Sequence, residues 1–267
     1  MRIWKLLDRA DVPGNGGELR LYQHGGHYSI RADGTELMTS HVYDSEEALA
    51  TLACQRVGVR KRVRLLVGGL GMGYTLAAAL RRLREDAEVV VAELVPAVVA
   101  WNRTYIGHLA GFPLEDPRVR VHQGDVAELL RHEHAAYDAI LLDVDNGPEG
   151  LTRAANDWLY GVGGLHSAQR ALREDGVLAV WSATPDRAFP ERLRCAAFEV
   201  EEHGPRTRGA RAMYSSQARP RARLDPPSSR HTIWLATPLE LDNRRSPRER
   251  GPSPPARKER RPQHDAG

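Results

Sequence analysis

Acidic residues follow three successive apolar runs of this chain, each with the length of a buried strand. Glu93 ends one run, Gly124 and Asp125 follow the next, and Asp143 and Asp145 follow the third. Parallel strands place such residues at one edge of a sheet, where open α/β sheets bind ligands. Unpaired carboxylates at one edge repel each other, and a hydroxyl-rich or cationic ligand relieves that repulsion.

This arrangement predicts a separate role for each acid. Glu93 suits the two hydroxyls of a ribose, and Asp125 suits the exocyclic amine of adenine. Asp143 and Asp145 are then left beside a positively charged reacting group. Gly124, directly before Asp125, is expected to lie at the same bound nucleoside.

A glycine-rich turn precedes these acids and narrows the class of ligand. Gly69, Gly71 and Gly73 alternate with other residues, whereas a dinucleotide fingerprint would require glycine in place of Tyr74. Glycine lets the backbone adopt positive φ and approach a ligand closely. Glu93 lies 20 residues after Gly73, in the usual window for a ribose-binding acid. The turn therefore predicts an S-adenosyl nucleoside rather than a dinucleotide, with Gly69, Gly71 and Gly73 as cofactor-binding residues.

The elements that must position these residues alternate regularly between strand and helix. Residues 45–241 are predicted to form a doubly wound, Rossmann-like, mostly parallel sheet of the class I methyltransferase type, with an antiparallel final strand. Residues 1–44 are predicted to hold a small β unit, with three short strands within 18–40. Ser45 is expected to cap the helix that follows. Residues 242–267 are rich in Pro and Arg and are predicted to be disordered.

Composition excludes several other classes. The 267-residue chain has no apolar run of membrane-spanning length and no adequate signal-peptide core, which predicts a cytoplasmic protein without membrane contact. Residues 243–267 carry eight Arg or Lys and three acids, which accounts for the net charge of +3. This segment and the Arg-rich loop at 205–230 hold almost no aromatic residues for stacking, so no nucleic-acid partner is expected. Cys54 and Cys195 are expected to be free thiols. His132-Glu133-His134 lacks a third ligand, and no metal is expected.

Several stretches between Leu19 and Ala236 share a wider pattern. They are V-G-G-L-G-M-G (67–73), V-V-V-A-E-L-V-P-A-V-V (89–99), D-P-R-V-R-V-H-Q-G-D (116–125), Y-D-A-I-L-L-D (137–143) and D-G-V-L-A-V (175–180). The chain resembles the spermidine synthase, or polyamine aminopropyltransferase, family in its spermidine-synthase-like bacterial branch.

The resemblance implies a class I methyltransferase-like fold that binds S-adenosylmethionine or its decarboxylated form as co-substrate. By matching position, Glu93 would hold the ribose and Asp125 the adenine amino group. Asp143 would align the attacking amine and accept its proton, and Asp145 belongs to the same acidic pair. A small-molecule amine or other acceptor and a possible homodimer follow from the same likeness.

Departures from the family pattern keep three functions open. Leu70 stands where the family usually has an aspartate that holds the aminopropyl amine, and Trp181 stands where it often has a glutamine that contacts polyamine. The first function is aminopropyl transfer from decarboxylated S-adenosylmethionine to an amine. The alternative is a methyltransferase that uses ordinary S-adenosylmethionine on an unknown acceptor. A third possibility is a nucleoside-binding protein without catalysis, which the carboxylate of Asp143 disfavours.

Overall fold

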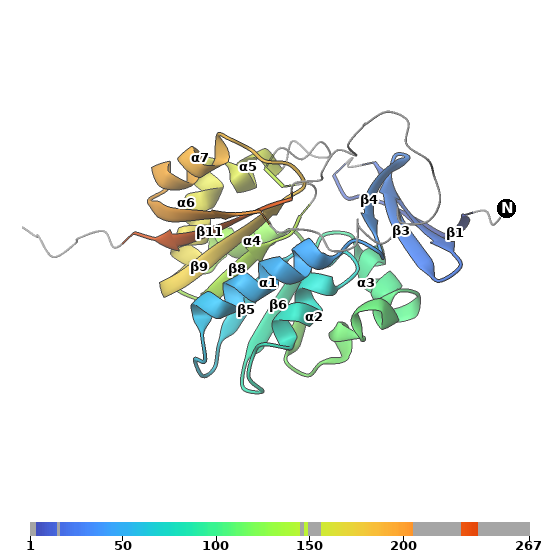
Figure 1. The fold of residues 1–267 in the computed structure, drawn as a ribbon, viewed down its shortest axis with the longest axis horizontal. Helices are drawn as coiled ribbons and strands as arrows, with labels where there is room; N and C mark the ends of the chain where they lie inside the picture. The colour runs from blue at the N-terminus through green and yellow to red at the C-terminus, as the bar shows by residue number, and fades with distance from the viewer. Residues whose placement is uncertain (1–3, 15–16, 145–146, 149–155, 205–230, 240–267) are drawn as a thin grey trace, which may run out of the picture.

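The computed structural model describes residues 4–14, 17–144, 147–148, 156–204 and 231–239. They form two sheets that lie side by side, with the N-terminal sheet beside one end of the larger sheet (Figure 1). The predicted disordered tail, the Arg-rich loop at 205–230 and the catalytic candidate Asp145 fall outside these residues.

The N-terminal sheet has four antiparallel strands in sequential order, one more than the sequence predicts. The additional strand, β1, carries exposed and partly exposed residues of both charged and apolar type, so it shows no alternation that the sequence could reveal. Backbone pairing with β2 defines it instead. The side chain of Trp101, on α3, donates a hydrogen bond to Asp8 in β1 at 2.8 Å and ties this sheet to the larger one. The strands are β1 (Lys5–Asp11), β2 (Glu18–His24), β3 (His27–Ala32) and β4 (Thr35–Thr39).

The larger sheet confirms the predicted doubly wound topology. Its seven strands lie in the order β10-β11-β9-β8-β5-β6-β7, and the five strands from β9 to β7 run parallel. The strand β11 is antiparallel to both of its neighbours, as predicted for a closing hairpin. The strands are β5 (Arg64–Gly68), β6 (Glu88–Glu93), β7 (Val119–Gln123), β8 (Tyr137–Leu142), β9 (Leu172–Ser182), β10 (Phe198–His203) and β11 (Thr232–Pro238).

Helices cover both faces of this sheet with their apolar sides, which explains why its strands are almost continuously hydrophobic. Leu65 and Val67 on β5 point into a core with α1, α2 and α3, while Leu66 points into a second core with α4, α6 and α7. The first core continues into the N-terminal sheet through Leu21 and Ile30. The helices are α1 (Asp44–Val57), α2 (Tyr74–Leu80), α3 (Pro96–Thr104), α4 (Val126–His132), α5 (Asn156–Tyr160), α6 (Val162–Ala171) and α7 (Phe189–Cys195), with 3-10 turns at Gly107–Ala110 and Pro113–Glu115.

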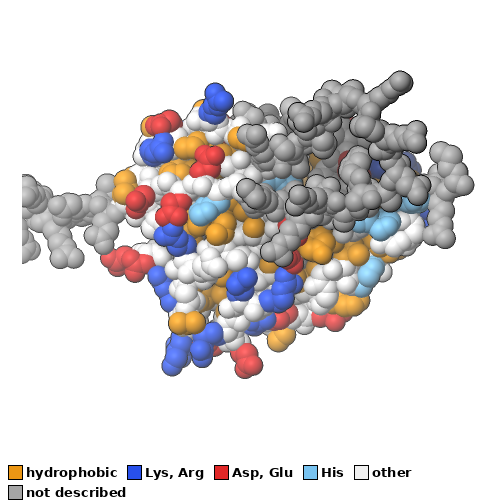
Figure 2. Space-filling view, in the orientation of Figure 1, with side chains coloured by type: hydrophobic (Ala, Val, Ile, Leu, Met, Phe, Trp, Pro, Cys, Tyr) orange, Lys and Arg blue, Asp and Glu red, His pale blue; other side chains and the backbone are white. Residues whose placement is uncertain are grey.

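The surface carries basic and acidic side chains that are interspersed on the face shown in Figure 2. Ion pairs also join different elements: Arg81 meets Glu47 at 2.6 Å, and Arg56 pairs with Glu201. Among the helices within the described ranges, none is long and apolar enough to cross a membrane.

Candidate functional site

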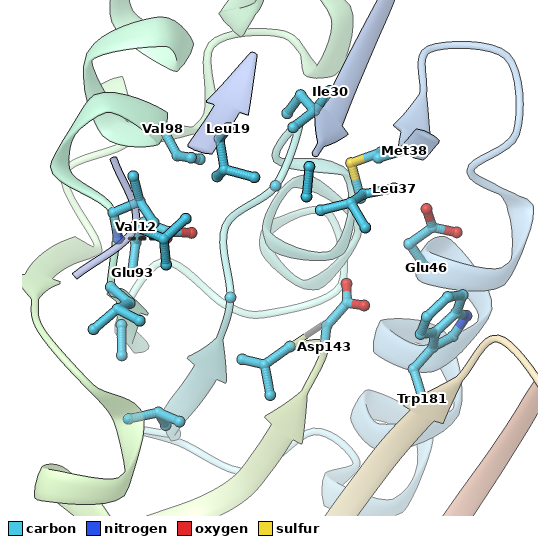
Figure 3. Close-up of a pocket in the computed structure, with 18 of the residues that line it drawn as sticks. Val12, Leu19, Ile30, Leu37, Met38, Glu46, Glu93, Val98, Asp143 and Trp181 are labelled. Carbon is cyan, nitrogen blue, oxygen red and sulfur yellow. Dashed lines mark hydrogen bonds between the residues drawn. The ribbon is translucent and has the colours of Figure 1, made fainter. Parts of the chain in front are cut away.

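A cavity of about 560 Å³ lies where the carboxyl ends of the central strands meet the N-terminal sheet. Its floor comes from the loops after β5, β6, β7 and β8, and its roof comes from aliphatic residues of the N-terminal sheet (Figure 3). The cavity brings together Gly69, Gly71, Glu93, Gly124, Asp125 and Asp143, as the sequence predicts, and adds Glu36, Glu46, Trp181 and His231.

The glycine turn has the close approaches that glycine alone permits. Gly69 has φ of 90°, and a Cβ atom there would lie 2.2 Å from the carbonyl oxygen of Asp143. That contact is far below van der Waals distance and involves backbone on the neighbouring strand end. Gly73 is the N-cap residue of α2 and has the left-handed conformation, with φ of 84°. Unlike Gly69 and Gly71, it does not line the cavity. The turn therefore lets β5 and β8 carry Asp143 to the cavity wall.

Glu93 is held rigidly at the end of β6. One carboxylate oxygen accepts a hydrogen bond from the backbone N–H of Leu70 at 3.0 Å, and the other accepts one from Val95 at 2.8 Å. The side chain is 8% exposed and lines the cavity. Because each carboxylate oxygen can accept more than one hydrogen bond, the fixed group still has capacity for ligand hydroxyls. The glycine turn and the predicted ribose acid are thus direct neighbours.

Asp125 has a structural task in addition to its place at the cavity. It precedes α4, and one of its carboxylate oxygens accepts a hydrogen bond from the backbone N–H of Ala127 at 2.8 Å. This capping role by itself accounts for an acid directly before α4, whether or not a ligand binds there. The adjacent Gly124 donates its N–H to the carbonyl oxygen of Glu93 at 2.9 Å, which joins the two predicted binding segments.

Asp143 lies at the end of β8, on the wall of the cavity. Its Oδ2 accepts a hydrogen bond from the hydroxyl of Thr75, on α2, at 2.5 Å. Burial raises the pKa of Asp143 to about 6, and the Thr75 hydrogen bond offsets part of that increase. A carboxylate that titrates near neutral pH can accept a proton from a bound group and release it again.

A second acid, Glu46, was not identified from the sequence as a site residue. It is 5% exposed on α1 and lines the cavity on the same side as Asp143, with Trp181 beside it (Figure 3). Burial raises the pKa of Glu46 to about 7, and the negative charge of Asp143 adds to this. No Lys or Arg of the described chain forms an ion pair with either carboxylate. Two acidic side chains without a basic ion-pair partner among the described residues therefore share one end of the cavity.

The residues around Glu46 correct the prediction for Ser45. The helix α1 begins at Asp44 with Tyr43 as its N-cap residue, and Ser45 does not cap it. Instead, the Ser45 hydroxyl bonds to Glu46 at 2.5 Å and to Nδ1 of His231 at 2.8 Å.

Two further cavity residues are Trp181, which lies on β9, and His231, which directly precedes β11. Nε1 of Trp181 is buried and has no hydrogen-bond partner among the described residues. Because His231 is 186 residues from Ser45, no local pattern in the sequence could have paired them.

Replacing Glu46 with Gln is expected to raise the melting temperature more at about pH 8 than at about pH 5. The folded-state pKa of Glu46 is raised from an ordinary 4.5 to about 7, so its contribution to stability is complete below 4.5 and is lost as pH rises through 7. Gln remains neutral throughout and avoids that loss. Thermal unfolding at both pH values measures the effect. Glu47→Gln removes the same charge one residue along α1, outside the cavity lining, and an equal pH trend in that control would contradict the prediction.

Comparison with known proteins identifies the family to which the chain is similar. The spermine/spermidine synthase domain matches residues 44–186, more than half of the chain. A polyamine aminopropyltransferase of Mycobacterium tuberculosis is 31% identical over 180 residues, which cover 65% of this chain and 31% of that protein. Spermine synthase of Arabidopsis thaliana is 34% identical over 136 residues, covering 50% of this chain and 35% of that protein. The chain spans 22% to 40% of the length of the curated relatives that it matches.

Solved structures support the fold. Spermidine synthase from Thermotoga maritima superposes with a TM-score of 0.67 at 18% identity, over 87% of this chain and 72% of that one. Human methyltransferase-like protein 13, in complex with SAH, gives a TM-score of 0.51 at 19% identity over 75% and 84%. The fold is therefore that of the class I methyltransferases, as predicted, and the domain match over residues 44–186 shows that this chain belongs to the spermine/spermidine synthase family.

Proposed function

We propose that this protein transfers an aminopropyl group from decarboxylated S-adenosylmethionine to an amine acceptor. The observation that carries the proposal is the charge of the cavity. Five carboxylates line it among the described residues, and no Lys or Arg of those residues does: Glu36, Glu46, Glu93, Asp125 and Asp143. The decarboxylated donor carries a sulfonium and an ammonium, and both are favoured there. Ordinary S-adenosylmethionine carries a carboxylate as well, which these acids would repel.

Each cavity residue then has a role that its environment supports. Glu93, fixed by the backbone of Leu70 and Val95, accepts hydrogen bonds from the ribose hydroxyls. The carboxylate oxygen of Asp125 that does not cap α4 accepts from the adenine amino group. Gly69, Gly71 and Gly124 line the cavity and allow the backbone to lie close to the nucleoside, and Gly73 shapes the turn that leads into α2.

The reaction needs a positioned amine and a proton acceptor. The neutral amine attacks the methylene carbon next to the sulfonium; a C–N bond forms, the C–S bond breaks, and the sulfur keeps the electron pair as a neutral thioether. The new ammonium loses a proton to Asp143, whose raised pKa suits this exchange. Most of the rate enhancement comes from holding amine and carbon in line, because the sulfonium is already a good leaving group. Asp145, which lies outside the described residues, stays a second candidate at this end.

The names of the relatives agree with this proposal. Polyamine aminopropyltransferases of Mycobacterium tuberculosis and Nitrosomonas europaea are among them, and a spermidine synthase of similar fold was solved with the transition-state analogue AdoDATO. We also propose that the acceptor is a small-molecule amine and that the protein forms a homodimer.

A donor comparison tests the proposal. Binding of each donor is measured by calorimetry, and turnover is followed by the product: methylthioadenosine from aminopropyl transfer, or S-adenosylhomocysteine from methyl transfer. We expect the decarboxylated donor to bind more tightly and to give methylthioadenosine with at least one amine of a diamine and polyamine panel. Tighter binding of S-adenosylmethionine with formation of S-adenosylhomocysteine would instead assign a methyltransferase. Binding without either product across the panel would support a nucleoside-binding protein without catalysis.

A further inference from the structure

Glu46 is a buried acid that the reaction described above does not use. It lies on α1 at the same end of the cavity as Asp143, and both side chains line that cavity (Figure 3). The titratable groups around Glu46 come from several elements. They are Asp44 and Glu47 on α1, Tyr74 on α2, Asp143 at the end of β8 and His231 before β11.

A continuous line of hydrogen-bonding groups leads from Glu46 to the start of β11. The hydroxyl of Ser45, fully buried, lies 2.5 Å from Oε2 of Glu46 and 2.8 Å from Nδ1 of His231. His231 is half-buried, lines the cavity and packs its ring against that of Trp181, with 5.1 Å between ring centroids. A hydroxyl between a carboxyl group and an imidazole can accept from one and donate to the other at the same time.

We propose that Glu46, Ser45 and His231 form a proton relay that carries the proton released by the acceptor amine out of the reacting end of the cavity. The proposal rests on the proposed aminopropyl transfer. Glu46 acts as a catalytic residue beside the amine, while Ser45 and His231 act through it.

Each group in the relay receives one proton and gives up one proton. The ammonium formed by C–N bond formation loses its proton to Asp143, and Asp143 passes that proton to Glu46 at the same end of the cavity, which leaves a neutral amine, an Asp143 carboxylate and a protonated Glu46. The carboxyl group of Glu46 donates that proton to Ser45 Oγ, and Ser45 passes its own hydroxyl proton to Nδ1 of His231. Glu46 is again a carboxylate that accepts from Ser45, and the imidazolium of His231 releases the Nε2 proton.

The pKa directions make Glu46 the resting proton acceptor and His231 a transient one, so the step from Glu46 to His231 runs uphill and is completed when His231 releases its Nε2 proton. Burial raises the pKa of Glu46 to about 7, so the group accepts a proton near neutral pH instead of remaining a fixed anion. Burial lowers the pKa of His231, so its imidazolium gives up a proton readily once it forms. The structural alternative is that the Ser45 hydrogen bonds serve only to attach α1 to β11. The tests below include readouts that this alternative would leave unchanged.

The first test does not depend on turnover. The titration of His231 is followed by NMR in the parent protein, in Glu46→Gln and in Ser45→Ala. A carboxylate linked through the hydroxyl stabilises the imidazolium, so both variants are expected to lower the pKa of His231. Ser167→Ala is the matched control, because Ser167 is a buried serine whose hydroxyl bonds only within α6, to the carbonyl of Gly163 at 3.1 Å, and to Arg170. An unchanged His231 titration in Glu46→Gln would overturn the relay.

The second test measures catalysis. Glu46→Gln is expected to lower kcat by ~10²-fold, the usual lower bound for a positioned acid or base, with little change in donor KM. His231→Ala is expected to lower kcat on the order of 10-fold and to regain activity when imidazole is added, because a free base can replace the proton acceptor. Loss of activity in His231→Ala without rescue, in a variant whose circular dichroism matches the parent, would overturn the relay.

The two proposals fail separately. If the parent forms no methylthioadenosine, the proposed transfer is wrong, and the NMR titration still decides whether Glu46, Ser45 and His231 are coupled. If the parent forms methylthioadenosine but Glu46→Gln turns over normally, the transfer stands and the relay is wrong. If Ser45→Ala does not fold, Ser45→Thr, which keeps the hydroxyl, is expected to retain the coupled titration.

Discussion

An Asp143→Asn variant is expected to lose ~10²-fold or more in kcat while it binds the donor about as well as the parent. Asn keeps the size of the side chain and can still meet the Thr75 hydroxyl, which lies 2.5 Å from Oδ2 of Asp143. It cannot take a proton from the new ammonium and carries no charge to attract the amine. The loss therefore falls on the chemical step and on acceptor binding. Calorimetry measures donor affinity and product formation measures kcat, so the two assays together separate donor binding from turnover.

The pH dependence gives this prediction a second readout. The pKa of Asp143 is raised from an ordinary 3.8 to about 6, so the carboxylate form needed as proton acceptor accumulates as pH rises through that value. The kcat/KM of the parent should rise with pH in this window, and the part of the rise that belongs to Asp143 should be missing in Asp143→Asn.

Asp138 provides a matched control on the same strand, far from the cavity. It lies near the start of β8, accepts from the backbone N–H of Arg64 at 2.8 Å and pairs with Arg173 at 2.6 Å. Asp138→Asn is expected to lower stability and to leave kcat close to the parent value. Normal turnover by Asp143→Asn, or an equal loss of kcat in the Asp138 control, would contradict the catalytic assignment.

Replacing Glu93 with Ala is expected to weaken nucleoside binding by about 1.5–3 kcal/mol, the scale of hydrogen bonds to a charged group. The substitution removes the predicted ribose acceptor. It also leaves the buried N–H groups of Leu70 and Val95 without their side-chain acceptor, so a loss of stability should accompany the loss of affinity. Calorimetry with methylthioadenosine measures the affinity, because this nucleoside lacks the transferred group.

The control for this effect is Glu36→Ala, a second acid of the cavity lining. Glu36 accepts from the Ser29 hydroxyl at 2.9 Å and pairs with Arg31, both within the N-terminal sheet, and no backbone N–H of the glycine turn depends on it. Its removal should change methylthioadenosine affinity little. Equal losses in the two variants would mean that overall cavity charge, and not Glu93 itself, governs nucleoside binding.

The sequence alone determined the fold and the placement of Glu93, Asp125 and Asp143 at one edge of the sheet, because both depend on local patterns. Apolar strands that alternate with amphipathic helices require a sheet covered on both faces, and that topology places every strand's carboxyl end at one edge. Glu93 is the last residue of β6 and Asp143 directly follows β8, so the sequence could place both at the same edge of the sheet without knowledge of packing. The same holds for Gly69, because the glycine spacing predicts a turn in which a glycine adopts positive φ.

Tertiary structure decided the parts that depend on contacts between distant segments. The strand β1 is mostly exposed and exists through backbone pairing with β2, which leaves no hydrophobic pattern to read. Asp125 proved to be a helix cap as well as a cavity residue. Glu46 looked like an ordinary acid in the first turn of a helix. Only the packing of α1 against β8, β9 and β11 buries it beside Asp143 and connects it, through Ser45, to a histidine 186 residues away. The free energy of a buried charge depends on which groups surround it in space and not on its neighbours in sequence.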